Sequence, residues 1–156
     1  MSDASDGPGK AAADDPTEDD WRARRRQAAD AQAEALAQRQ AAEHAAARRL
    51  LAEFVAEATR QGPPPVPLRA RSYDGRHRYR TPLHGWYLRR NESVAVSTAG
   101  DFYVLGVPGS LRALVRGVEP EPADPPLVLG RGGRDGESVD LADALRVVLE
   151  GDRRSP

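Results

Sequence analysis

The stretch "VPLRARSYDGRHRYR", residues 66–80, decides how this chain folds. Before it the apolar residues recur with a helical period, and from here on they alternate with polar ones. Two alternating segments flank Asp74 and Gly75, a pair that favours the positive φ angles of a two-residue type I′ turn. The stretch therefore predicts an antiparallel β-hairpin.

The register of this hairpin would gather its arginines on one surface. A turn at Asp74-Gly75 pairs Arg71 with Arg78 and Arg69 with Arg80, because residues directly opposite each other share a face. The surface predicted to bind an anion or a partner consists of Arg69, Arg71, Tyr73, Arg76, Arg78 and Arg80. The opposite surface, predicted to lie on a core, carries Leu68, Ala70, Ser72, His77 and Tyr79. His77 is there interpreted as a hydrogen-bonded core histidine.

Such a surface needs counter-charge, since like charges directly across a ladder cost about 0.2 to 1 kcal/mol per pair. Three sources are open at this stage: water and salt around splayed side chains, acidic residues elsewhere in the chain, or an anionic partner such as nucleic acid. The net charge of −1 hides the patch, because residues 1–20 carry −6 and residues 69–90 carry +6. The charge distribution thus permits an anionic partner that net charge alone would argue against.

Residues 18–61 give the strongest helix signal. Thr17 can cap the helix with Asp20 three residues on, the body is rich in alanine, and Gly62 with the prolines of residues 63–65 stops it. At about 1.5 Å per residue the helix would be roughly 65 Å long and would project beyond a small domain. Near its C-terminal end, a docking stripe is predicted for Leu50, Leu51, Phe54, Val55 and Ala58.

The earlier part of this helix has only Trp21 and Leu36 as large apolar residues. Two interpretations remain open. A partner helix could close on its small residues as a weak coiled coil, or the helix could stand solvated, supported by pairs such as Glu18–Arg22 and Asp20–Arg24.

After the proline linker at residues 62–67, further strands are predicted at residues 85–90, 92–98 and 102–107, with a short one at residues 127–130. The predicted core residues are Trp86, Leu88, Val94, Val96, Phe102 and Val104, and either face of the strand at residues 102–107 could be the buried one. Residues 110–118 fit a strand or a helix, in which Ser110 would be the cap and Leu111, Leu114, Val115 and Val118 one stripe. A closing helix at residues 138–151 would turn Leu141, Ala144, Leu145, Val148 and Leu149 inward and end at Gly151.

These elements predict an α+β fold. A small antiparallel sheet in residues 68–151 is covered by the C-terminal helix and preceded by the long helix. Residues 1–17 lack large apolar side chains and predict a disordered acidic tail, and residues 152–156 a second disordered tail.

A second anion site is considered in the glycine-rich segment "GRGGRDGES", residues 130–138, with Arg131 and Arg134 as the basic residues. It lacks both common nucleotide-binding glycine patterns, so a flexible loop is the simpler interpretation. His84 could act as a general base, yet no nucleophile or orienting carboxylate is recognisable beside it. The chain has no cysteine, and its three histidines show no ligand spacing, so we expect no catalytic residue, metal site or cofactor.

The composition is that of a cytoplasmic bacterial protein with neither a signal peptide nor a membrane partner, and its abundant arginine and alanine fit GC-rich coding. We expect a non-catalytic interaction or adaptor protein that binds a protein partner through residues 18–61 or forms a homodimer there. The alternative is an RNA- or DNA-binding module that uses residues 69–80. The acidic tail could shield that surface until a partner displaces it.

Overall fold

The computed structural model describes residues 15–131 and 137–153, which include one long helix, α1 (Glu18–Gln61). The chain divides into two compact units, the first ending at Arg39 and the second beginning at Gln40. Residues 1–14 of the predicted acidic tail and residues 154–156 of the predicted C-terminal tail lie outside the described residues. No helix in the described part of the chain has the length and apolar content to cross a bilayer.

In the first unit, α1 begins where its capping residues place it. The Thr17 hydroxyl accepts a hydrogen bond from the Asp20 amide at 3.3 Å, and the Asp20 carboxylate accepts from the Thr17 amide at 3.0 Å. This reciprocal pair satisfies backbone groups that would otherwise lack partners. Arg22 lies 3.6 Å from both Glu18 and Asp19. The expected Asp20–Arg24 pair is replaced, because Asp20 caps the helix while Arg24 lies over the Trp21 ring, 5.7 Å from its centroid.

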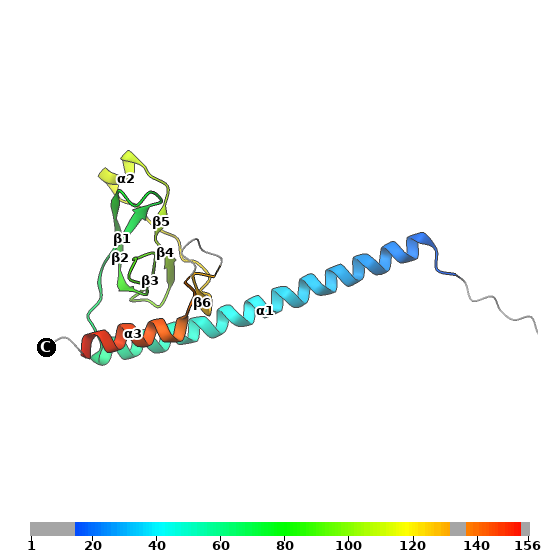
Figure 1. Cartoon of the computed structure of the whole chain (residues 1–156), viewed down its shortest axis with the longest axis horizontal. Coiled ribbons are helices and arrows are strands. Elements are labelled where there is room, and N and C mark those ends of the chain that lie inside the picture. The colour runs from blue at the N-terminus through cyan, green and yellow to red at the C-terminus, as the bar shows by residue number, and fades with distance from the viewer. Residues whose placement is uncertain (1–14, 132–136, 154–156) are drawn as a thin grey trace, which may run out of the picture. The chain divides into compact units, whose positions relative to one another are not determined.

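The second unit is built on a five-stranded sheet with the order β4-β3-β2-β1-β5 (Figure 1). Its strands are β1 (Val66–Ser72), β2 (Arg78–Tyr87), β3 (Val94–Ser97), β4 (Phe102–Val104) and β5 (Gly106–Val107). All neighbours pair antiparallel except β1 and β5, which are parallel. The α+β class is confirmed, and the prediction of a purely antiparallel sheet is wrong.

Leu105 closes this sheet on itself. It is the one residue between β4 and β5, which stand at opposite ends of the strand order. In a flat sheet these ends would lie about 19 Å apart, at about 4.8 Å per strand, whereas one residue spans about 3.5 Å. The sheet must therefore curl until its edges meet. The Leu105 amide donates to Ser93 at 2.9 Å, and its carbonyl accepts from the Arg71 amide at 2.8 Å, so one residue bonds to both sides.

The predicted strands differ from the observed ones in two places. Residues 76–80 and 85–90, predicted as separate strands, belong largely to the single strand β2. It continues through Pro82 because it bulges there: Leu68 alone stands opposite residues 81–83. The Thr81 hydroxyl donates to the Leu68 carbonyl at 2.6 Å, so the missing amide of the proline breaks no ladder bond. The predicted strand at residues 102–107 is broken at Leu105 into β4 and β5.

The remaining elements are α2 (Leu111–Arg116), a two-stranded sheet of β6 (Val128–Leu129) and β7 (Val139–Asp140), and α3 (Leu141–Arg153). Residues 110–118 thus form a helix with Ser110 as its cap. The predicted end of the last helix at Gly151 is wrong, because α3 continues to Arg153.

The main core lies between the curled sheet and the two long helices. Phe54 of α1 meets Trp86 of β2 edge to face, with ring centroids 5.4 Å apart. The Trp86 indole donates to the Pro63 carbonyl at 2.8 Å, which fixes the linker against the sheet. The buried members of this cluster are Ala47, Leu51, Phe54, Ala58, Trp86, Leu88, Val96, Phe102, Leu129, Leu141, Ala144 and Leu145.

These residues include most of those predicted for the core. Leu50, Val55, Val94, Val148 and Leu149 pack against the cluster and are partly buried. Val104 was predicted to be buried and is 52% exposed. Alternation along β4 puts Val104 on the same side as Phe102, whereas Leu105 is buried on the other side, in the separate cluster with Leu68, Ala95 and Tyr103.

Gly85 provides a test of the sheet. A Cβ at this position would lie 2.0 Å from the Val96 carbonyl oxygen, and no side-chain rotation can relieve a backbone clash. We expect Gly85→Ala to lower the free energy of unfolding by about 3 kcal/mol or more, measured by chemical denaturation.

The matched control for Gly85 is Gly151→Ala. Gly151 lies within α3 and has open space around it. This change should raise the free energy of unfolding by about 0.5 to 1 kcal/mol, because alanine favours helix. Equal effects of the two substitutions would contradict the close β2–β3 pairing.

Candidate interaction surface

The register of β1 and β2 places four arginines on one surface. Arg69 stands opposite Arg80 and Arg71 opposite Arg78, as the sequence predicts. The reverse side of the same strands is buried at Leu68, Ala70, Ser72 and Tyr79. We call Arg69, Arg71, Arg78 and Arg80, together with Tyr73 and Arg76 of the adjoining turn, the arginine face.

The turn itself is not the predicted type I′ turn. Gly75 has a φ of 72°, whereas Asp74 has a negative φ, and a type I′ turn needs both angles positive. The Ser72 carbonyl accepts from the Gly75 amide at 2.8 Å, and the Ser72 amide donates to the His77 carbonyl at 3.0 Å. β1 therefore ends at Ser72, β2 begins at Arg78, and residues 73–77 form the loop between them.

Asp74 fixes this loop through its side chain. Its Oδ1 accepts from the Ser72 hydroxyl at 2.5 Å and from the Arg76 amide at 2.9 Å. These hydrogen bonds, with a smaller contribution from the positive charge of Arg76, hold the pKa of Asp74 below its ordinary value of 3.8. The competing side-chain bonds explain why the sequence rule for Asp-Gly gives the wrong turn.

His77 is exposed, which contradicts its prediction as a core residue. It belongs to the loop rather than to β2, so strand alternation does not apply to it. Its ring stacks on the Tyr79 ring at a centroid distance of 6.5 Å and an angle of 29°.

The arginine face is only partly neutralised by the described residues. Arg78 forms an ion pair with Glu92, and Arg80 donates to the Val115 carbonyl at 3.2 Å. The positive charge of Arg76 helps to lower the pKa of Asp74. The Arg69 side chain is exposed and has no ion pair with any described residue. The Nε of Arg71 is buried without a hydrogen bond within this part of the chain.

Of the three tyrosines near these arginines, Tyr73 alone offers an exposed ring, at 76%. Tyr79 is buried and its hydroxyl accepts from the Ser110 amide at 3.0 Å. Tyr87 is half-buried and its hydroxyl accepts from the Arg69 amide at 2.9 Å. A base-stacking surface would therefore have one ring.

The structure does not bring the glycine-rich segment to the arginine face. Arg131 is exposed and follows β6, which lies at the end of the sheet away from α2 (Figure 1). Arg134 lies outside the described residues. The two ends of this segment lie close together, because a Cβ at Gly130, whose φ is 78°, would lie 2.6 Å from the Glu137 carbonyl oxygen. The Arg89 guanidinium donates to the same carbonyl at 3.2 Å.

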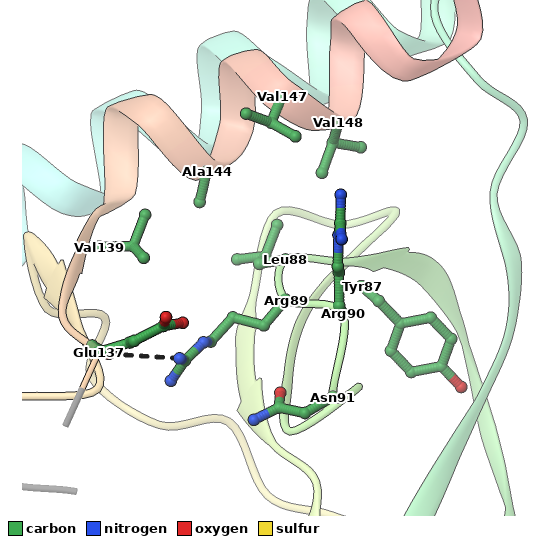
Figure 2. Close-up of a pocket in the computed structure, with 10 residues that line it drawn as sticks. All are labelled: Tyr87, Leu88, Arg89, Arg90, Asn91, Glu137, Val139, Ala144, Val147 and Val148. Carbon is green, nitrogen blue, oxygen red and sulfur yellow. Dashed lines mark hydrogen bonds between the residues drawn. The ribbon is translucent and has the colours of Figure 1, made fainter. Parts of the chain in front are cut away.

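Next to this bond is a groove of about 620 Å³, which sequence reasoning missed (Figure 2). Its walls are apolar side chains of α3 and of the end of β2, and Arg90 and Asn91 stand at the rim. The lining residues are Tyr87, Leu88, Arg89, Arg90, Asn91, Glu137, Val139, Ala144, Val147 and Val148. The sequence signal is Val147, an aliphatic residue that falls outside the predicted inward stripe of the last helix. The structure leaves it 60% exposed. Arg90 and Glu137 bring opposite charges to the same lining.

The histidines form no centre with one another. His84 is exposed, and no hydrogen bond joins its ring to the described residues. His44 bonds to the Pro125 carbonyl at 2.9 Å and so helps to fasten residues 123–127 to α1. Within the described ranges no cluster of acidic residues and histidines could hold a metal ion.

Comparisons with protein-family models, with curated proteins and with solved structures find no match to this chain.

Asp74 allows a test of the turn. Because its folded pKa lies below the unfolded value, the carboxylate stabilises the loop above about pH 4, and this contribution is lost as the pH falls through the folded pKa. A carboxyl-carbon titration by NMR should give Asp74 a pKa below 3.8. The protection of the Gly75 and Arg76 amides against exchange, relative to the intrinsic rate at each pH, should fall below that pH.

Asp74→Asn is the control for this titration. It should remove the pH dependence of the protection at both amides, measured relative to the intrinsic exchange rate. A pKa for Asp74 at or above the ordinary value would contradict the two hydrogen bonds to its Oδ1.

Proposed function

We propose that the protein is a non-catalytic interaction module that contacts an anionic macromolecule through the arginine face. The observation that carries the proposal is the cross-strand register, which sets Arg69 against Arg80 and Arg71 against Arg78. Folding holds these like charges together, although only Arg78 among the four has a carboxylate partner in the described residues. An anionic partner would supply the missing counter-charge, and binding it would release counterions.

A protein is the partner class that the surface favours. The arginines lie on a pair of neighbouring strands beside a single exposed tyrosine, and arginine with tyrosine is typical of the centres of protein interfaces. The partner would present carboxylates, which guanidinium groups bind in pairs of parallel hydrogen bonds.

The first unit supports an adaptor role. Between Glu18 and Arg39, α1 exposes Trp21 at 50% and Leu36 at 55%. Its other residues are alanine, glutamine and charged residues, and the many small alanines would let a second helix approach closely. We propose that this segment binds a protein partner or a second copy of the chain.

Polyglutamate serves as the probe of the arginine face. We expect the full chain to bind it, and Arg71→Ala with Arg78→Ala to weaken binding and to flatten its salt dependence, measured by fluorescence anisotropy at several salt concentrations. The matched control is Arg49→Ala with Arg90→Ala, which removes the same charge from exposed positions outside the face. Equal weakening by both pairs would reduce the effect to net charge and contradict the proposal.

Sedimentation equilibrium tests the first unit. If two chains join through residues 18–39, Trp21→Asp with Leu36→Asp should convert a dimer into a monomer, because buried charges would replace the two large apolar side chains. If the wild-type chain is monomeric at all concentrations, it does not dimerise through this segment, and the partner of the segment is a different protein.

Nucleic acid is the second candidate partner, and Tyr73 is the observation that favours it. The ring is 76% exposed and lies beside Gly106 of β5. A base could stack on this ring while phosphates meet the neighbouring arginines.

A gel shift with single-stranded RNA separates the two candidates. A nucleic-acid module should bind it. Arg71→Ala with Arg78→Ala should then make the slope of log K against log salt concentration shallower by about one to two units. Tyr73→Ala should weaken binding, whereas Tyr73→Phe should not. If RNA binds no more tightly than polyglutamate at equal charge, the protein-partner interpretation is favoured.

A further inference from the structure

The short helix α2 turns its aliphatic side chains toward solvent. Leu111 is 82% exposed and Val115 is 74% exposed, while Ala113 is the buried residue of the helix. Residues four apart lie on one side of a helix, and Ala113 falls on the opposite side. Leu111, Leu114 and Val115 of the predicted stripe therefore face outward. Val118, its fourth member, lies beyond the helix and packs against the cluster of Ala70, Tyr79 and Ala113.

Both ends of α2 are fixed to β2, so the helix cannot roll to bury this stripe. At its start, the Ser110 amide donates to the Tyr79 hydroxyl at 3.0 Å. At its end, the Val118 amide donates to the Arg80 carbonyl at 2.8 Å. Gly117 permits this approach, since its φ is 76° and a Cβ there would lie 2.6 Å from the Arg80 carbonyl oxygen. The exposure of Leu111 and Val115 is thus built into the fold.

Basic side chains border the aliphatic stripe. Arg112 and Arg116 lie one residue beyond Leu111 and Val115 and are both exposed. Arg116 and Arg80 also line a shallow hollow of about 480 Å³, with Glu119 as its one acidic residue. We call Leu111, Arg112, Leu114, Val115 and Arg116 the α2 patch.

The charge of the α2 patch selects its occupant. A second copy of the chain would bring the same arginines into contact with these, and like charges would oppose the pairing. The occupant must accept protruding aliphatic side chains and also carry negative charge. A bilayer surface with anionic headgroups does both, because its interface is fluid enough to surround a convex helix.

We propose that the α2 patch binds the surface of an anionic lipid bilayer. Leu111 and Val115 insert at the boundary between headgroups and acyl chains, and Arg112 and Arg116 meet the phosphates. This inference goes beyond the proposed function and uses different residues. In this contact no segment of the chain crosses the bilayer. Only the outer surface of the short helix α2 touches it.

The experiment is co-sedimentation of the full chain with phosphatidylcholine vesicles, with or without phosphatidylglycerol. The chain should bind the mixed vesicles and not the neutral ones. Leu111→Ser with Val115→Ser should weaken binding at least about tenfold, because the inserted apolar area is lost. Arg112→Ala with Arg116→Ala should weaken it about 25-fold, at about fivefold per arginine. All four positions are exposed, so the variants keep the core intact.

The matched control is Val104→Ser with Val147→Ser, which removes aliphatic side chains of similar exposure elsewhere on the surface. It should bind like the wild type. Because the chain contains no cysteine, Leu111→Cys can also be labelled at one site with an environment-sensitive dye. Its emission should shift to the blue on mixed vesicles, while the same dye at Val147→Cys should not respond.

Two results would overturn the proposal. One is a wild-type chain that does not bind mixed vesicles, which would point to an acidic protein as the occupant. The other is unchanged binding by Leu111→Ser with Val115→Ser. If that variant binds normally while Arg71→Ala with Arg78→Ala does not, the arginine face is responsible, so the two proposals fail separately.

Discussion

Leu105 imposes the constraint on which the second unit depends. Because one residue joins the two outer strands of a five-stranded sheet, the sheet has no flat arrangement available to it. Closure creates an inside, filled by Leu68, Ala95, Tyr103 and Leu105 itself. The outer surface of the closed sheet has two parts. Around Trp86 and Val96 the outer surface is covered by α1 and α3, whereas along β1 and the start of β2 it carries arginines. The arginine face thus belongs to the part of the closed surface that α1 and α3 leave uncovered.

Arginine has a second role in this structure, as a clamp on backbone carbonyls. Arg80 reaches Val115 in α2, and Arg89 reaches Glu137 across the glycine-rich segment. A planar guanidinium can donate to a carbonyl while keeping its charge at the surface, which a single ammonium group does less well. Even if coding bias supplied the arginines, the fold uses several of them. The residues most suitable for testing a partner are therefore those without such a bond.

Local rules account for the parts of this fold that the sequence predicts. The register of the hairpin follows from alternation around Asp74-Gly75, and α1 follows from its capping residues and its stop at Gly62. The turn type was missed because the Asp74 carboxylate bonds to Ser72 and Arg76, which no dipeptide rule includes. The parallel pairing of β1 with β5 was missed because it joins residues about 35 positions apart in the chain. The direction of the α2 stripe was missed for a similar reason, since tertiary bonds to Tyr79 and Arg80 set it.

Closure has a consequence for how this protein behaves when crowded. An open sheet offers rows of unpaired amides and carbonyls on which another chain can add a strand, a common first step toward fibrils. Here β5 pairs with Arg71 and Ser72 at the end of β1, and Phe102 of β4 bridges to Ala123. Within the described residues these contacts occupy part of each outer edge of the five-stranded sheet. The paired part of β1 carries Arg71, so at that point the strand presents its polar surface without offering its backbone to a second copy of the chain.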